Sequence, residues 1–382
     1  TGANNTVMGS QALFNNTTGA DNVAIGRSAL CTNTTAAQNT AVGTEAVLKT
    51  TTGANNTGIG FIALCDNTTA SENTAVGAFA LRKNTTGSEN TAVGTSSMIT
   101  NTTGSANVGL GFCALKFNTT GATNVAIGNV ALCKNTTASN NVAVGNLALR
   151  NNTTGACNTA VGGCALYSNT TGIYNLALGM EALANNTTAN SNVSVGYYSL
   201  FAATTAGCNV AVGVQAGDSV TTGFDNTLIG DHAGHKVTTG DNNTLLGVDA
   251  GTDAVRDVTT GDNNIVIGNN SSATAHIKID WTVTSDLRDK TEIKDVKHGL
   301  DFVNQITPIE YKFKKSREDD TPHGLTKYGF KAQEILELEG DNPVIINNDD
   351  TDNLKLTNAH LIPVLVNAIK ELKAEIDLLK NK

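Results

Sequence analysis

The sequence predicts a mainly β fold: a parallel β-solenoid or β-roll of 17-residue coils, trimeric, followed by a small α+β domain that ends in a coiled-coil helix. Three observations predict it. A motif recurs every seventeen residues up to Gly247 and once more at Gly268, aromatic and charged residues make up only 4% and 15% of a chain with 38 glycines, and all four prolines lie beyond the repeats. We therefore expect a solenoid at 1–270, a junction at 271–284 that includes Trp281, and a separate domain at 285–382.

The repeat is marked by a glycine that follows an apolar residue. This glycine recurs at intervals of seventeen from Gly9 to Gly247, and Gly268 follows after twenty-one, which indicates four inserted residues near Asp253–Asp257. Seventeen residues are too few for a helix pair or a propeller blade, but they suit one solenoid coil. Sixteen such coils, stacked ~4.8 Å apart, would form a rod on the order of 75 Å long.

Each coil reads N-T-A-V-G-x-x-A-L-x-x-N-T-T-G-x-x. The stretch N-T-A-V-G alternates a β-branched, a small and a large apolar residue, which predicts a short strand with one buried face. Its glycine suits a corner where φ is positive or where backbones approach closely. The Asn and Thr-Thr positions are expected to stack from coil to coil as hydrogen-bond ladders that satisfy polar groups at the corners.

Two positions of the coil exchange volume near the end of the repeats. The Leu that stands four residues after the corner glycine is replaced by glycine, and the small residue two before the next corner glycine becomes large. The exchanged positions are Gly217 with Leu228, Gly234 with Leu245, and Gly251 with Val266. Because protein cores are close-packed, we expect both positions to point into the same space.

The strand motifs N-T-A-V-G and N-V-A-I-G resemble repeats in the head domains of trimeric autotransporter adhesins and in the fibres of phages and large viruses. The resemblance covers about residues 1–268. It implies a parallel β-roll wound as a trimer.

Composition argues against several other functions. The net charge of −9 without a basic stripe disfavours nucleic-acid binding. No apolar run reaches the ~18 residues of a membrane span.

Seven cysteines, an odd number with no CxxC pair, disfavour a zinc site or a disulfide framework and are interpreted as small apolar fillers. His232 and His235 are weak metal candidates, so we expect no metal and no cofactor. The chain starts in mid-repeat at Thr1, so we expect further sequence before it.

The end of the chain has a helical pattern. From His360 to Lys380 apolar residues are spaced alternately three and four apart, at Ile362, Leu365, Ile369, Leu372, Ile376 and Leu379. This predicts a coiled-coil seam of about three heptads, with Pro363 in the first helical turn. Ile at a and Leu at d would alone favour two strands, in conflict with a trimer.

Four motifs follow one another in the last hundred residues. They are S-D-L-R-D-K at 285–290, I-T-P-I-E-Y-K-F at 306–313, Y-G-F-K-A-Q-E at 328–334, and the helix at 361–372. Together they resemble the intramolecular chaperone auto-processing domain of phage endosialidases, phage tail fibres and myelin regulatory factors. The resemblance implies a Ser-Lys dyad that cuts the chain at Thr284–Ser285, with Ser285 as nucleophile and Lys290 as general base.

The implied chemistry is reasonable for these side chains. A serine hydroxyl needs an adjacent base, and a lysine amine is a base only when neutral, which burial favours. Closure of three modules on one another would supply that burial and would couple cleavage to assembly.

Without the other three motifs, the simpler interpretation would be that Ser285 caps a turn and that Lys290 is a solvated charge. Asp289 departs from the family, which often has an apolar or basic residue there. At most, then, the chain is a single-turnover self-cleaving endopeptidase.

The resulting prediction is a structural homotrimeric viral fibre for host attachment. Its location would be the virion, outside the cell, and its partners a host surface receptor, which could be a glycan, and other virion proteins. One alternative is a bacterial trimeric adhesin, which would need an anchor after the coiled coil. The other is a glycan-degrading tail spike, which the absence of a recurring carboxylate pair disfavours.

Overall fold

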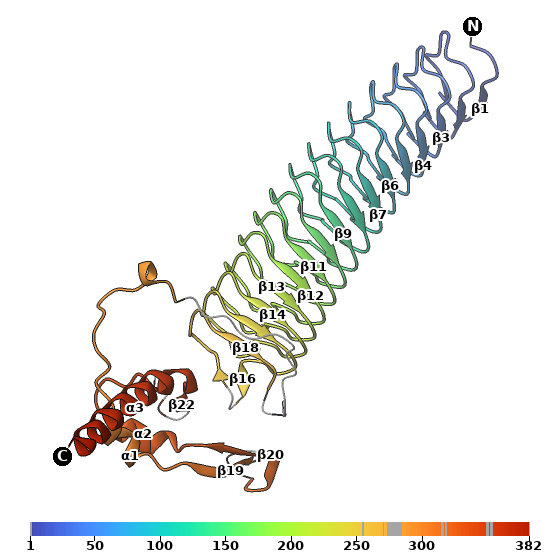
Figure 1. Ribbon diagram of the computed structural model, residues 1–382. Coiled ribbons are helices and arrows are strands. Elements are labelled where there is room, and N and C mark those ends of the chain that lie inside the picture. Colours follow the sequence, from blue (N-terminus) through green and yellow to red (C-terminus); the bar gives the residue numbers. More distant parts are fainter. Residues whose placement is uncertain are drawn as a thin grey trace. The chain divides into compact units, whose positions relative to one another are not determined.

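The computed structural model describes residues 2–253, 256–269, 271–272, 285–314, 317, 319–348, 351 and 354–381 (Figure 1). The chain divides into two compact units. The first comprises Thr1–Asp253 with Asp257–Asn269, and the second comprises Ala254–Arg256 with Asn270–Lys382. Each unit has its own cluster of buried apolar side chains.

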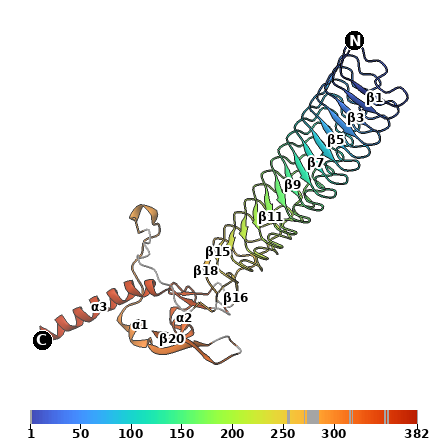
Figure 2. The ribbon, with the colours of Figure 1, turned by 90° about the vertical axis from the view of Figure 1, so that its right-hand side faces the viewer.

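The first unit is a parallel β-solenoid, as predicted. One strand from each coil joins a 16-stranded sheet whose order follows the chain, and Figure 2 shows the coils stacked along the rod. Each residue pairs with its equivalent in the next coil, such as Val142 with Thr159. The strands are β1 Thr6–Met8, β2 Val23–Ile25, β3 Thr40–Val42, β4 Thr57–Ile59, β5 Thr74–Val76, β6 Thr91–Val93, β7 Val108–Leu110, β8 Val125–Ile127, β9 Val142–Val144, β10 Thr159–Val161, β11 Leu176–Leu178, β12 Val193–Val195, β13 Val210–Val212, β14 Thr227–Ile229, β15 Thr244–Leu246 and β18 Ile265–Ile267.

The core of the solenoid consists mainly of alanine and leucine. In the coil of β9, the middle strand residue Ala143 is fully buried, and so are Ala148 and Leu149 beyond the corner. The two outer residues of the strand, Val142 and Val144, point away from this core and are only half-buried. The small residue of N-T-A-V-G therefore faces inward, and the large apolar one faces outward.

Asparagines form two buried ladders along the rod. The side-chain oxygen of Asn141 accepts the main-chain N–H of Asn158 at 2.9 Å, and the same contact repeats from coil to coil. In the second ladder, Asn152 Nδ2 donates to Asn135 Oδ1 at 3.0 Å. The threonine row differs, since Thr153 Oγ1 donates to the main-chain carbonyl of Thr170. The predicted ladders are confirmed for asparagine, whereas the threonine contacts run from side chain to backbone.

The corner glycines meet both conditions that the sequence predicted. Gly145 has φ +138°, and a Cβ built there would lie 2.5 Å from the carbonyl oxygen of Gly162 in the next coil.

The predicted exchange of volume between two core positions of the last coils is also confirmed. A Cβ on Gly217 would lie 2.5 Å from Cδ1 of Leu228, and one on Gly234 would lie 3.2 Å from Cδ1 of Leu245. A Cβ on Gly251 would meet Leu245 at 2.6 Å and not its expected partner Val266. The predicted insertion is a two-stranded sheet of β16 Thr252–Asp253 and β17 Arg256–Asp257.

From Asn4 to Leu200, each coil also contains three non-glycine residues in the left-handed region, which the sequence did not reveal. In one coil they are Asn140 (φ 62°), Leu147 (φ 61°) and Leu149 (φ 50°). Non-glycine residues rarely adopt this conformation. Here the tight turns between short strands require it, and hydrogen bonds between coils hold it in place, as from Leu149 N to Ala165 O at 3.0 Å.

The second unit is small and mixed. Its core contains Phe302, Ile335, Ile345, Ile346 and Leu361, all buried. Its elements are η1 Leu287–Asp289, α1 Leu300–Gln305, β19 Ile309–Lys314, β20 Pro322–Gly329, α2 Ala332–Glu339, β21 Ile346–Asn347, β22 Lys355–Leu356 and α3 Asn358–Lys380. β19 pairs with β20 and β21 with β22, each antiparallel.

Helix α3 begins earlier than its sequence pattern suggested. Its first residue is Asn358, after the N-cap Thr357, so Pro363 lies in the second turn and not in the first. A proline there cannot donate to the carbonyl four residues earlier. The expectation that Pro363 stands in the first helical turn was therefore wrong.

Candidate functional site

The candidate dyad is positioned by a short turn. Asp286 caps the 3-10 helix η1, and its carboxylate accepts the main-chain N–H of Arg288 at 2.9 Å. The Arg288 guanidinium closes the same turn with an ion pair to Asp286 at 2.6 Å. At the other end, the N–H of Lys290 donates to the carbonyl oxygen of Leu287 at 3.2 Å. The turn therefore brings residues 285 and 290 to the same side.

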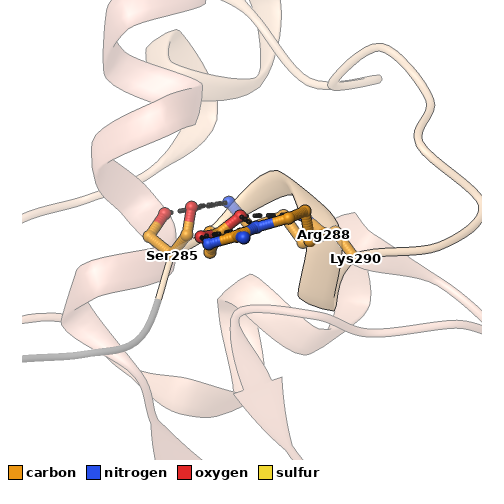
Figure 3. Close-up of polar contacts among 4 residues, drawn as sticks. Ser285, Arg288 and Lys290 are labelled. Atoms are coloured by element: carbon orange, nitrogen blue, oxygen red, sulfur yellow. Dashed lines mark hydrogen bonds and ion pairs between the residues drawn. The ribbon is translucent and has the colours of Figure 1, made fainter.

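Ser285 and Lys290, the two predicted site residues, lie in direct contact (Figure 3). Lys290 Nζ donates to Ser285 Oγ at 2.8 Å and to the Ser285 carbonyl oxygen at 3.0 Å. A nucleophile and its base are expected within about 2.6–3.2 Å of each other. With a neutral amine, the same contact would let the serine hydroxyl donate to Nζ.

The surroundings of the pair are polar and open. Ser285 and Lys290 are both exposed in the single chain. The hydrogen bonds from Arg288 lower the pKa of Asp286, and those same contacts raise the pKa of Arg288. The Asp286 carboxylate is therefore bound to Arg288. Asp289, the departure from the family pattern, is exposed. Thr284, on the other side of the predicted cut, lies outside the described residues, as do Trp281 and most of the junction.

The second and third motifs build the unit that carries the dyad. Ile306, at the start of the second motif, packs against the buried cluster, and so do Phe330 and Ala332 of the third. Strand β19 covers most of the second motif, and the third motif connects β20 to α2. These residues therefore contribute to the core of the unit.

The predicted seam of α3 faces away from the core of its own unit. The other face of the helix is buried through Leu361, Val364 and Ala368. Each side chain of the seam keeps between 41% and 70% of its surface exposed. The seam residues are Ile362, Leu365, Ile369, Leu372, Ile376 and Leu379. An apolar stripe of this kind is typical of a helix that packs against another chain.

The weaker candidates of the sequence are placed as follows. His235 Nδ1 lies 2.6 Å from Asp218 Oδ1, and His232 Nδ1 lies 3.1 Å from Asp231 Oδ2. Among the residues that the structure describes, no three His, Cys, Asp or Glu side chains gather as a metal ion would require. Within the same residues, no helix is long and apolar enough to cross a membrane.

The cysteines are not uniform fillers. Three of the seven are buried, three are half-buried and one, Cys208, is exposed. Burial raises the pKa of the Cys65 thiol to about 11. Such a thiol is almost entirely protonated at neutral pH, which fits a filler and not a nucleophile.

The chain thus combines a β-solenoid with a small α+β unit that has a Ser-Lys pair at its start and an exposed seam on its last helix. Residues 285–342 match the family model described as chaperone of endosialidase. The match includes both dyad residues and ends before α3. With the solenoid, it fits a tail-fibre protein with an intramolecular chaperone domain, as the sequence predicted. No curated protein and no solved structure matches the chain.

Proposed function

We propose that the chain is the subunit of a trimeric viral fibre used for host attachment, acting on the virion outside the cell. Its C-terminal unit aligns three chains, supports their folding, and is then released by cleavage at Thr284–Ser285. The observation that carries the proposal is the match of residues 285–342 to the endosialidase chaperone, together with the 2.8 Å contact between Ser285 and Lys290.

The solenoid needs an external source of register. Its coils repeat with the same Asn, Ala and Leu positions, so two chains that slip by one coil would still make nearly equivalent contacts. Parallel strands also form slowly and expose unpaired edges while they form. A C-terminal unit that joins three chains at one end, through the exposed seam of α3, would fix the register before the coils assemble.

The proposed cleavage uses only groups of this chain and water. Neutral Lys290 takes the proton of the Ser285 hydroxyl, and Oγ attacks the carbonyl carbon of Thr284. The bond from that carbon to the Ser285 nitrogen breaks, and the nitrogen takes up a proton, which leaves an ester between the two residues. Water then hydrolyses the ester, so that Thr284 ends in a carboxylate and Ser285 becomes a new N-terminus.

Assembly would switch this chemistry on. In the single chain Lys290 is exposed to water. A lysine amine loses its proton more readily when packing removes it from water. Packing of neighbouring chains over the turn would favour the neutral amine. Cleavage before trimerisation would separate the folding module from a fibre that has not yet assembled. The dependence of cleavage on trimer assembly would therefore ensure that the module is released only after it has acted.

Intact-mass analysis of the expressed chain tests the proposal. The wild type should give a fragment that begins at Ser285, whereas Ser285→Ala and Lys290→Ala should stay full length and still trimerise. Lys290→Arg should also stay uncut, because a guanidinium keeps its charge. The matched control is Lys294→Ala, another exposed lysine of this segment, which should cleave like the wild type.

Two results would overturn the assignment. Normal cleavage of Lys290→Ala would mean that the base lies elsewhere. A wild type that trimerises but never cleaves would make the C-terminal unit a permanent trimerisation cap.

A further inference from the structure

The positively charged side chains of the solenoid are gathered at two adjacent positions of the coil. These positions lie five and six residues after the corner glycine. Up to residue 250 the chain has eight lysines and arginines, and all but Arg27 stand at these two positions. The seven are Lys49, Arg82, Lys83, Lys116, Lys134, Arg150 and Lys236.

Stacking of the coils brings these positions together along the rod. The N–H of the second position donates to the carbonyl oxygen of the first position in the next coil, as from Lys134 to Arg150 at 3.0 Å and from Phe117 to Cys133 at 2.9 Å. The sequence showed no basic stripe because these cations stand about a coil or more apart along the chain. The fold places them in one column.

The middle of this column has almost no compensating negative charge. We call its five cations the cation column; Lys83 and Lys134 are exposed, and Arg82, Lys116 and Arg150 are half-buried. Between residues 82 and 180 the sequence has these five cations and one carboxylate, Glu89, which gives +4 in a chain of net charge −9. None of the five forms an ion pair with a residue that the structure describes.

This arrangement differs from the neighbouring part of the same column. There, Lys49 Nζ lies 2.7 Å from Asp66 Oδ1 in the next coil, so opposite charges are paired. In the cation column, Lys134 and Arg150 occupy neighbouring coils with no carboxylate beside them. Like charges on adjacent strands of a stack repel each other and destabilise it. An anion bound from outside would remove this repulsion.

Aromatic rings hold three of the five cations at the surface. Each of these cations lies over a ring, and the distances from the charged group to the ring centroid are 5.9 Å for Arg82 and Phe79, 5.1 Å for Lys116 and Phe117, and 5.6 Å for Arg150 and Tyr167. Arg150 also donates to the Tyr167 hydroxyl at 2.9 Å. Cations within about 6 Å of a ring centroid are attracted to its face. Side chains ordered in this way lose less freedom when they bind a ligand.

We propose that the cation column binds a linear anionic polysaccharide, with carboxylate or sulfate groups, along the rod. Arg82 and Arg150 are four coils apart, which is ~19 Å at ~4.8 Å per coil. A polymer that follows the column meets one cation after another, so that individually weak contacts add up. Lysine and arginine form charge-assisted hydrogen bonds with anionic oxygens.

The observations favour a sugar chain over a single-stranded nucleic acid. Nucleic acids of that kind bind largely by stacking their bases on aromatic faces. Here a cation already covers one face of each of the three rings. The inference rests on the proposed fibre for host attachment and assigns its receptor to the acidic polysaccharides.

Binding of the full chain to immobilised polysaccharides tests the inference. The probes are dextran sulfate, which carries sulfates, hyaluronan, which carries carboxylates, and neutral dextran. The wild type should bind at least one anionic probe and not neutral dextran, and added salt should weaken the binding. The stronger of the two anionic probes identifies the group that the column prefers.

A pair of double variants locates the binding surface. Lys134→Gln with Arg150→Gln should lower the affinity for the anionic probe roughly tenfold or more. The matched control, Arg27→Gln with Lys236→Gln, removes the same charge from exposed cations of the solenoid outside the cation column and should leave the affinity nearly unchanged. Circular dichroism and the melting temperature should be those of the wild type for both variants.

The outcomes separate this inference from the proposed fibre. Equal affinities of the two double variants, or equal binding of neutral dextran, would overturn the inference. A single-stranded oligonucleotide that displaces both anionic polysaccharides would make the partner a nucleic acid and would also overturn it. A wild type that trimerises and cleaves but binds no anionic probe refutes the inference alone. A monomeric chain that binds through Lys134 and Arg150 refutes the fibre alone.

Discussion

Replacing one asparagine of the buried ladder tests the account of the solenoid most sharply. Asn141 is fully buried, and its Oδ1 accepts the N–H of Asn158 at 2.9 Å. Its Nδ2 donates to the Gly155 carbonyl at 2.9 Å, which also accepts from Asn152. Asn141→Val therefore removes the acceptor of one buried N–H but leaves the carbonyl with a partner. One unsatisfied buried donor costs about 1–3 kcal/mol.

Hydrogen exchange can measure this loss at the affected amide. Since 1.4 kcal/mol is a factor of ten, protection of the Asn158 amide should fall roughly fivefold to 150-fold, and the melting temperature should drop. Asn146→Val is the matched control, because Asn146 is exposed and its contact with Asn129 lies at the surface. Equal protection and equal melting of the two variants would refute the claim that the buried ladder stabilises the rod.

The remaining predictions concern the core, the cysteines and the seam. Gly217→Ala should destabilise the rod because its Cβ meets Leu228, and Leu228→Ala in the same chain should relieve the clash. A double-mutant cycle by denaturation should give a coupling of at least about 0.5 kcal/mol, and additive effects would contradict shared space. At pH 8 a thiol reagent should label Cys208 far faster than Cys65, whose pKa is about 11, and equal rates by peptide mass mapping would contradict the burial of Cys65. Leu372→Asp should hinder trimerisation and slow cleavage, and unchanged native mass would show that the seam of α3 is not the contact.

The 17-residue periodicity was enough to predict most of the solenoid, because one coil geometry repeats throughout. Fixed Asn, Gly and Ala positions predicted the strand, the corner and the ladder, and the exchange of Gly217 with Leu228 predicted which positions share space. The spacing S-x-x-x-x-K alone did not predict that Ser285 and Lys290 touch. That prediction depended on the resemblance, and the structure adds the turn capped by Asp286 that makes the contact.

Other features could not be obtained from the pattern. A strand of three residues does not reveal which face is buried, so the outward position of residues such as Val144 emerged only from the packing. The left-handed conformation of Leu147 and Leu149 follows from tight turns that no local residue preference signals. The start of α3 at Asn358 was also missed, because the apolar spacing begins only later in the helix.

The central claim is that a C-terminal unit assembles the fibre and then removes itself. A time course of intact mass and native mass, taken on the wild-type chain over a dilution series, tests it most directly. The account predicts that the fragment beginning at Ser285 appears only where trimers form, and that its rate falls on dilution. Cleavage of a monomer at a rate independent of concentration would contradict the account.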